Sequence, residues 1–199
     1  MKVLFLDIDG VLNSENWFGY VQYCINNDMY NRVLNFVDID NEQKYKYIDD
    51  ERTEYKLNMI DDRAIANLNR IVKETGCKVV LSSSWRSSCE SDNAFTQYVF
   101  KLKGFKYELY GVTPRIWVKE FGTQRGEEIQ LWMNKESEKN EIESYVILDD
   151  DSDMLPDQMS NFILVDRQVG LTDKDVFTAI EISATSGASS AFADVFTEI

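Results

Sequence analysis

The sequence predicts an α/β fold, a doubly wound parallel sheet with helices on both faces. Two observations predict it. Short apolar runs alternate along the 199 residues with amphipathic segments of helical period. Three of these runs end in clustered acids or hydroxyls, at residues 7–9, 82–84 and 149–153. Ligands of such sheets bind beyond the carboxyl ends of the strands, so we expect the three clusters to meet at one edge.

The first expected strand is Val3–Leu6, which leads directly into Asp7, Asp9 and Gly10. Glycine frees the backbone to turn sharply at that point. Two acids so close together repel each other, and that cost is tolerable when a cation lies between them. The following stretch, about 14–58, is rich in Asn, Asp, Tyr and Lys and has weak periodicity. We interpret it as a small cap or flap insert after the first strand.

The rest of the chain alternates between the two kinds of element. A helix is expected over 61–76, with Asp61 at its start and Gly76 as its C-terminal cap. A last helix over 171–182 is capped by Thr172. The other expected elements are a strand at 78–81, a helix at 92–104, a strand at 105–111, a helix at 125–134 and strands at 145–148 and 161–166. This organisation predicts one domain over 1–182, with a loosely packed or disordered tail at 183–199.

The composition excludes several kinds of chemistry. The chain has no histidine, which removes Ser-His-Asp and Cys-His catalysis, imidazole zinc sites and histidine general bases. Catalysis would have to use carboxylates, hydroxyls, Lys, Arg and a hard metal ion. A net charge of −14 disfavours a long polyanionic partner, although a local basic groove would still accept a short nucleic-acid end.

Cysteine usage and hydropathy bear on location. The three cysteines, Cys24, Cys77 and Cys89, have no paired spacing, which is typical of a reducing compartment. No apolar run is long enough to span a bilayer. We therefore expect a cytoplasmic protein without a membrane partner; the sequence does not indicate its oligomeric state.

The acidic segment "DDDSDM" could be an acidic loop or a calcium loop, and an acidic turn stays open for Asp151 and Asp153. A calcium loop starting at Asp149 would need glycine where Met154 stands and glutamate where Ser160 stands, so that reading fails. Asp149 and Asp150 directly follow an apolar strand, and we predict that they bind a metal.

Taken in order, "LFLDIDGVLN", "VVLSSSWR" and "YVILDDDSD" resemble the first, second and fourth motifs of the haloacid dehalogenase-like (HAD) superfamily of phosphohydrolases. With "GVTP" and "RGEEI" between them, the series is most similar to a small HAD branch with relatives in nucleic-acid repair proteins. The resemblance covers nearly all of the chain except the insert and the tail. It implies a Rossmann-like fold and a Mg²⁺-dependent phosphatase.

The resemblance also implies roles for the acids. Asp7 would attack phosphorus and form an aspartyl-phosphate. Asp9 would protonate the leaving oxygen and then deprotonate the hydrolytic water. Mg²⁺ would be held by Asp7, the backbone carbonyl of Asp9, Asp149 and Asp150, and it would cancel the repulsion between the carboxylates.

Phosphate binding is assigned in the same way. Ser83 would bind the phosphoryl oxygens, with Ser82 as the alternative. Arg125 is the preferred phosphate-binding base because it stands at the start of the helix that leads into the strand ending at Asp149. Its side chain would point back toward the strand ends, where the free N–H groups of the helix also favour an anion. Lys119 is the alternative. Arg86 is a further candidate contact.

The substrate stays open at this point. The preferred reading is a nucleotide or another small phosphorylated metabolite. The alternatives are a phosphorylated nucleic-acid end and a phosphate- or metal-binding module without turnover.

Overall fold

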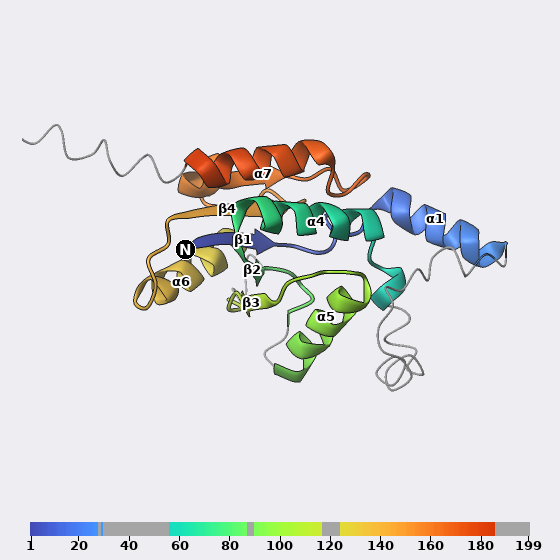
Figure 1. Cartoon of the computed structure of the whole chain (residues 1–199), viewed down its shortest axis with the longest axis horizontal. Helices are drawn as coiled ribbons and strands as arrows, with labels where there is room; N and C mark the ends of the chain where they lie inside the picture. Colours follow the sequence, from blue (N-terminus) through green and yellow to red (C-terminus); the bar gives the residue numbers. More distant parts are fainter. Residues whose placement is uncertain (28, 30–55, 87–89, 117–123, 186–199) are drawn as a thin grey trace, which may run out of the picture.

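A computed structural model describes residues 1–27, 29, 56–86, 90–116 and 124–185 (Figure 1). Its centre is a five-stranded sheet of order β3-β2-β1-β4-β5, in which every neighbouring pair is parallel. The strands are β1 (Lys2–Leu6), β2 (Lys78–Leu81), β3 (Leu109–Val112), β4 (Ser144–Asp149) and β5 (Phe162–Leu164).

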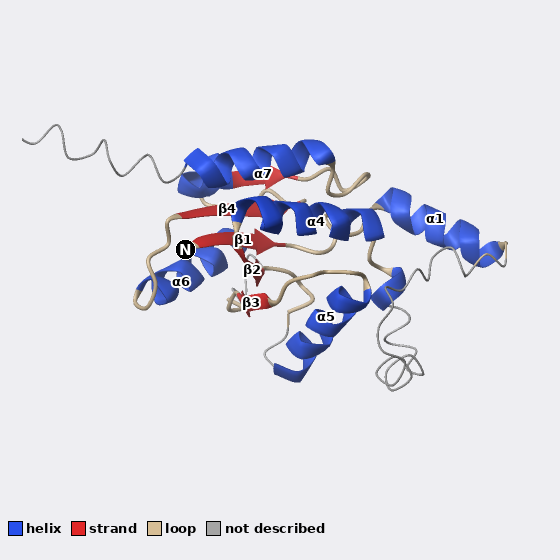
Figure 2. Ribbon diagram, in the orientation of Figure 1, coloured by secondary structure: helices blue, strands red, loops and turns tan. Residues whose placement is uncertain are grey.

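Helices cover both faces of this sheet, as predicted (Figure 2). Successive side chains of a strand point to opposite faces, so Leu4 and Leu6 of β1 enter one apolar cluster while Val3 and Phe5 enter another. The first cluster contains the buried side chains of α4 (Asp62–Thr75), α5 (Glu90–Leu102) and α7 (Asp173–Thr185). The second contains those of α6 (Arg125–Ser137).

The order of the strands reverses beside β1. The chain passes from β1 to β2 and β3 on one side, and α6 then returns it to β4 on the other side. Leu6 of β1 is level with Leu148 of β4, and the Asp7 N–H donates to the Leu148 carbonyl at 2.9 Å. The ends of β1 and β4 therefore lie together at the switch point, where ligands bind in folds of this class.

Helix ends follow local sequence signals. The Asp61 carboxylate accepts from the Arg63 N–H at 2.9 Å, and Gly76 caps α4 in the left-handed conformation, with φ 69°. Thr172 and Asp175 exchange hydrogen bonds at the start of α7. That helix continues to Thr185, three residues beyond the expected end at 182, and the Ser183 carbonyl accepts from the Ser144 hydroxyl of β4 at 3.1 Å.

Some elements differ from expectation. Strand β3 begins at Leu109 rather than 105, because Phe105 leaves the strand and packs edge-on against Phe100 of α5. A 3₁₀ helix, η2 (Pro156–Asn161), precedes β5. Within the expected insert, Glu15–Asn26 forms helix α1, while residues 28 and 30–55 lie outside the described part, as do 186–199 of the expected tail. In the described residues no helix has the length and apolar character needed to cross a membrane.

Candidate active site

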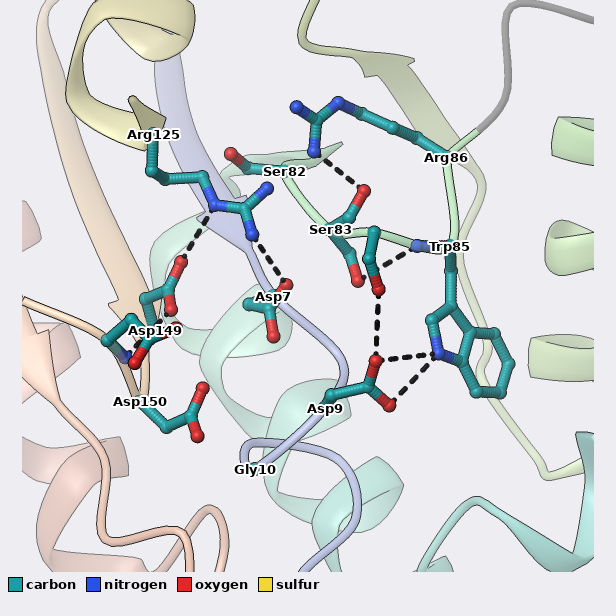
Figure 3. A network of polar contacts seen from close by, with 12 residues as sticks. Asp7, Asp9, Gly10, Ser82, Ser83, Trp85, Arg86, Arg125, Asp149 and Asp150 are labelled. Atoms are coloured by element: carbon teal, nitrogen blue, oxygen red, sulfur yellow. Dashed lines mark hydrogen bonds and ion pairs between the residues drawn. The ribbon is translucent and has the colours of Figure 1, made fainter. Parts of the chain in front are cut away.

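Three carboxylates meet at the switch point, and we call them the carboxylate cluster: Asp7, Asp149 and Asp150 (Figure 3). Asp7 follows β1, Asp149 ends β4, and Asp150 follows it. One oxygen from each lies within 4.8 Å of the other two. Asp7 is 4% exposed and Asp149 is 1% exposed, so the cluster is largely shielded from water. The sequence-based grouping of these three residues matches this placement.

The turn after Asp9 depends on Gly10. Its φ is 77°, and a Cβ at this position would overlap the Asp150 carboxyl group. Glycine therefore lets the turn approach the cluster closely. Asp150 also accepts two hydrogen bonds from the Arg167 guanidinium, at 3.1 and 2.8 Å. Sequence reasoning missed Arg167, which lies beyond β5 and carries no motif signal.

Burial makes the ionised cluster unfavourable. It raises the pKa of Asp7 to about 8, with a further increase from Asp149, while Arg125 and a hydrogen bond from Ser83 oppose the shift. Burial likewise raises the pKa of Asp149 to about 7, against the opposing charge of Arg125. The buried Oδ2 atom of Asp149 accepts no well-oriented hydrogen bond from the described residues, although the Arg125 guanidinium lies 3.2 Å away. Crowded, buried carboxylate oxygens fit a hard divalent cation such as Mg²⁺.

Arg125 lies between two members of the cluster. Its guanidinium is 3.4 Å from Asp7 Oδ1 and 3.2 Å from Asp149 Oδ2. The residue begins α6, and Asp153 holds that helix start: Arg125 N–H donates to its carboxylate at 3.0 Å and Gly126 N–H to its carbonyl at 3.1 Å. The expectation that these first N–H groups are free for an anion is therefore wrong, although the Arg125 side chain is in place. Lys119 lies outside the described residues.

Ser83, rather than Ser82, lies beside Asp7. The Ser83 hydroxyl is near enough to the Asp7 carboxyl group to lower its pKa, and the residue is completely buried. The Ser82 hydroxyl instead accepts from Thr113 at 3.4 Å. This arrangement favours Ser83 as the hydroxyl of the site.

Asp9 is oriented by neighbours that sequence reasoning missed. Its carboxylate accepts from Asn13 Nδ2 at 3.1 Å, from the Ser84 hydroxyl at 3.0 Å and from the Trp85 indole N–H at 3.0 Å. Figure 3 shows this carboxylate turned toward Trp85, on the side away from Asp149 and Asp150. Its side chain is not a member of the carboxylate cluster, and a contribution to metal binding would come from its backbone carbonyl.

Arg86 is not aimed at a phosphate, contrary to the sequence-based candidate contact. Its side chain is 2% exposed, donates to the Ser83 carbonyl at 2.6 Å and pairs with Glu128 of α6. Burial lowers the Arg86 pKa, and Glu128 opposes that shift. The sequence analysis did not single out Glu128, because nothing in the local sequence signals its complete burial.

An all-parallel α/β sheet with a buried carboxylate cluster at its switch point defines a domain built for polar chemistry at its strand ends. The chain belongs to the family described as the HAD domain in Swiss Army Knife RNA repair proteins, whose model matches residues 3–176. The resemblance to a HAD branch linked to nucleic-acid repair is thereby confirmed. No curated protein and no solved structure matches the chain.

Proposed function

We propose that this protein is a Mg²⁺-dependent phosphatase that hydrolyses a phosphomonoester through an aspartyl-phosphate. One observation carries the proposal: buried Asp7 lies among Asp149, Asp150, Arg125 and Ser83 at the switch point. The set combines a nucleophile with acids, a cation and a hydroxyl around one place, as phosphoryl transfer requires. Membership of a HAD family supports the same reaction class.

In the proposed first step a carboxylate oxygen of Asp7 attacks phosphorus, and the bond from phosphorus to the leaving oxygen breaks. The carboxylic acid of Asp9 gives its proton to that oxygen, which departs as an alcohol. In the second step the Asp9 carboxylate takes a proton from water, and the water oxygen attacks phosphorus. Inorganic phosphate leaves, and Asp7 regains its carboxylate.

Other side chains would neutralise and orient the phosphoryl group. Arg125 would offer N–H donors to its oxygens, and Ser83 would add a hydroxyl donor. Asp7, Asp149, Asp150 and the Asp9 carbonyl would hold Mg²⁺, which when bound supplies positive charge against the phosphate and the crowded acids. Asn13, Ser84 and Trp85 would keep the Asp9 carboxyl group in one orientation.

Two substrate classes remain in the proposal. The net charge of −14 favours a nucleotide or another small phosphorylated metabolite. A phosphorylated nucleic-acid end is the second candidate, favoured by the family's description as a domain of RNA repair proteins. The insert expected at about 14–58 would select between them as a cap. A module without turnover is disfavoured because Asp7 and Asp9 are both present.

We also propose a cytoplasmic setting for this chemistry. Cys24 and Cys77 are both buried and unpaired, as is typical of proteins kept in a reducing compartment. Cys89 lies outside the described residues.

The test is a panel of phosphomonoesters and 3′- or 5′-phosphorylated oligonucleotides, assayed with Mg²⁺. We expect phosphate release from at least one class, complete loss with excess chelator, and recovery when Mg²⁺ or Mn²⁺ is returned. Release that persists in chelator would contradict the metal site. No release from any member of the panel would contradict the phosphatase assignment.

A further inference from the structure

A fully buried ion pair, formed by Arg86 and Glu128, contacts Ser83 and Arg125 of the candidate active site. Glu128 is completely buried and Arg86 is 3% exposed. Besides Arg86, the Glu128 carboxylate accepts from the Ile116 N–H at 2.9 Å and lies 3.9 Å from the Arg125 guanidinium. One carboxylate thus serves two arginines and one backbone amide.

Each of these partners belongs to a different segment of the site. Arg86 donates to the carbonyl of Ser83, so it holds the loop after β2. Arg125 contacts Asp7 and Asp149 from the start of α6. Ile116 belongs to the segment that follows β3. Glu128 therefore connects the segment that carries the candidate hydroxyl with the helix start that carries the candidate guanidinium.

Stability alone is a poor explanation for such a pair. Removing two charges from water costs several kcal/mol per ion in proteins, and apolar residues of similar volume often replace a buried pair without loss of stability. A role in fixing the relative placement of its neighbours explains the pair better.

We infer that Glu128 is a positioning residue, which sets the separation and orientation of Ser83 and Arg125 for one phosphoryl group. The inference rests on the proposed function, in which those two side chains bind the phosphoryl oxygens. Glu128 also shares the Arg125 charge with Asp7 and Asp149, so Arg125 is not held by the carboxylate cluster alone. A displacement of about 1 Å in such a group is sufficient to cost roughly 10²-fold in rate.

Two variants and a control separate positioning from plain structural support. Glu128→Gln keeps the shape and removes the charge. The double variant Arg86→Met with Glu128→Leu replaces the whole pair by apolar side chains. Lys103→Met is the control, because Lys103 is also a buried cation in an ion pair, with the partly exposed Asp62, and this pair shares no residue with the Glu128 contacts or the carboxylate cluster. Thermal unfolding, kcat and KM, and inhibition by inorganic phosphate are measured for each, at a temperature where all are folded.

We expect Glu128→Gln to lower both Tm and kcat/KM, the latter by about 10²-fold. The double variant should regain much of the Tm, because no buried charge is left unpaired, yet keep the low kcat/KM and weak inhibition by phosphate. Lys103→Met should lower Tm and leave kcat/KM unchanged.

Two other outcomes would each overturn one of the proposals. If both Glu128 variants keep the kcat/KM and the phosphate affinity of the unmodified protein while folded, the positioning role is wrong. If the unmodified protein binds phosphate but releases none from any substrate, the phosphatase assignment fails. In that case a loss of phosphate affinity in the Glu128 variants would still support positioning.

Discussion

Asp7 is held where a carboxylate is costly, close to Asp149 and shielded from water. Asp7→Asn keeps the shape of the side chain but removes the attacking oxygen. We expect phosphate release to fall by roughly 10³-fold or more, with no loss of Tm, because the amide carries no charge to bury. Asp157→Asn, on an exposed acid of η2, is the matched control and should change neither quantity. Turnover retained by Asp7→Asn would exclude the covalent route.

Gly10 is a second position where a single substitution should disturb the site, because an added Cβ would overlap the Asp150 carboxyl group. Gly10→Ala places a Cβ on the Asp150 carboxyl group and forces alanine into a left-handed conformation. We expect a loss of at least about 1–2 kcal/mol in the free energy of unfolding from the backbone alone, together with weaker Mg²⁺ binding. Denaturant unfolding and calorimetric titration measure the two effects.

Gly19→Ala supplies the comparison for this variant. Gly19 lies in α1, and nothing lies within 4 Å of a Cβ added there. Because alanine has a higher helix propensity than glycine, Gly19→Ala should raise the free energy of unfolding by about 0.5–1 kcal/mol and leave Mg²⁺ binding unchanged. Equal effects of the two substitutions would show that the Gly10 turn does not support the cluster.

Among the elements, helix α6 is capped by a residue that lies far from it in the sequence. Gln124, at its N-cap position, makes no capping hydrogen bond from its side chain, and Asp153 of the β4–η2 loop accepts the Arg125 N–H instead. We expect Asp153→Ala to cost about 1 kcal/mol in the free energy of unfolding and to lower kcat/KM, since the helix start carries Arg125. Asp151→Ala, on a neighbouring acid that is 72% exposed, should have neither effect. A milder result for Asp153 than for Asp151 would contradict the capping role.

The sequence was sufficient to predict the elements whose signals are local. Buried parallel strands read as short apolar runs, so β1, β2 and β4 were placed within one or two residues. Because the carboxyl ends of parallel strands share one edge, the meeting of Asp7 with Asp149 and Asp150 was predictable as well. The predicted start of β3 is too early, because Phe105 packs against Phe100 of α5 instead of continuing the strand. The sequence shows that Phe105 is apolar but not which element it packs against.

The residues that support the site were not predictable, because their roles depend on contacts between distant segments. The sequence assigns Trp85 no role at the site, yet its indole N–H donates to Asp9. In the sequence Glu128 cannot be distinguished from the adjacent Glu127, and the packing of α6 against the loop of Arg86 buries it. Arg167 gives no local signal at all.

For the whole molecule, the raised pKa values of Asp7 and Asp149 link stability to pH. Without metal the folded protein holds protons, up to about pH 7–8, that the unfolded chain releases near its ordinary pKa of 3.8. The free energy of unfolding should therefore fall as pH rises from 3.8 to about 8. In chelator we expect a higher Tm at about pH 5.5 than at about pH 8, and Mg²⁺ should raise Tm most at the higher pH.

Self-repulsion from a net charge of −14 would act in the same direction, so a variant is needed to separate the two causes. Asp149→Asn removes one of the two buried titrations and changes the net charge by a single unit. Its Tm should depend less steeply on pH than that of the unmodified protein in chelator. Identical slopes would assign the pH dependence to the overall charge instead.

The central position of β1 has a kinetic consequence. This strand is hydrogen-bonded to β2 on one side and to β4 on the other, and the Asp7 amide itself bonds to Leu148. Exposing these amides to solvent requires the sheet to separate, whereas amides of loops exchange through small local openings. In deuterium exchange of the native protein, we expect the Phe5, Leu6 and Asp7 amides to exchange only through global unfolding. The segment carrying Ser84 and Trp85 lies outside the strands and should take up deuterium sooner than the Asp7 amide.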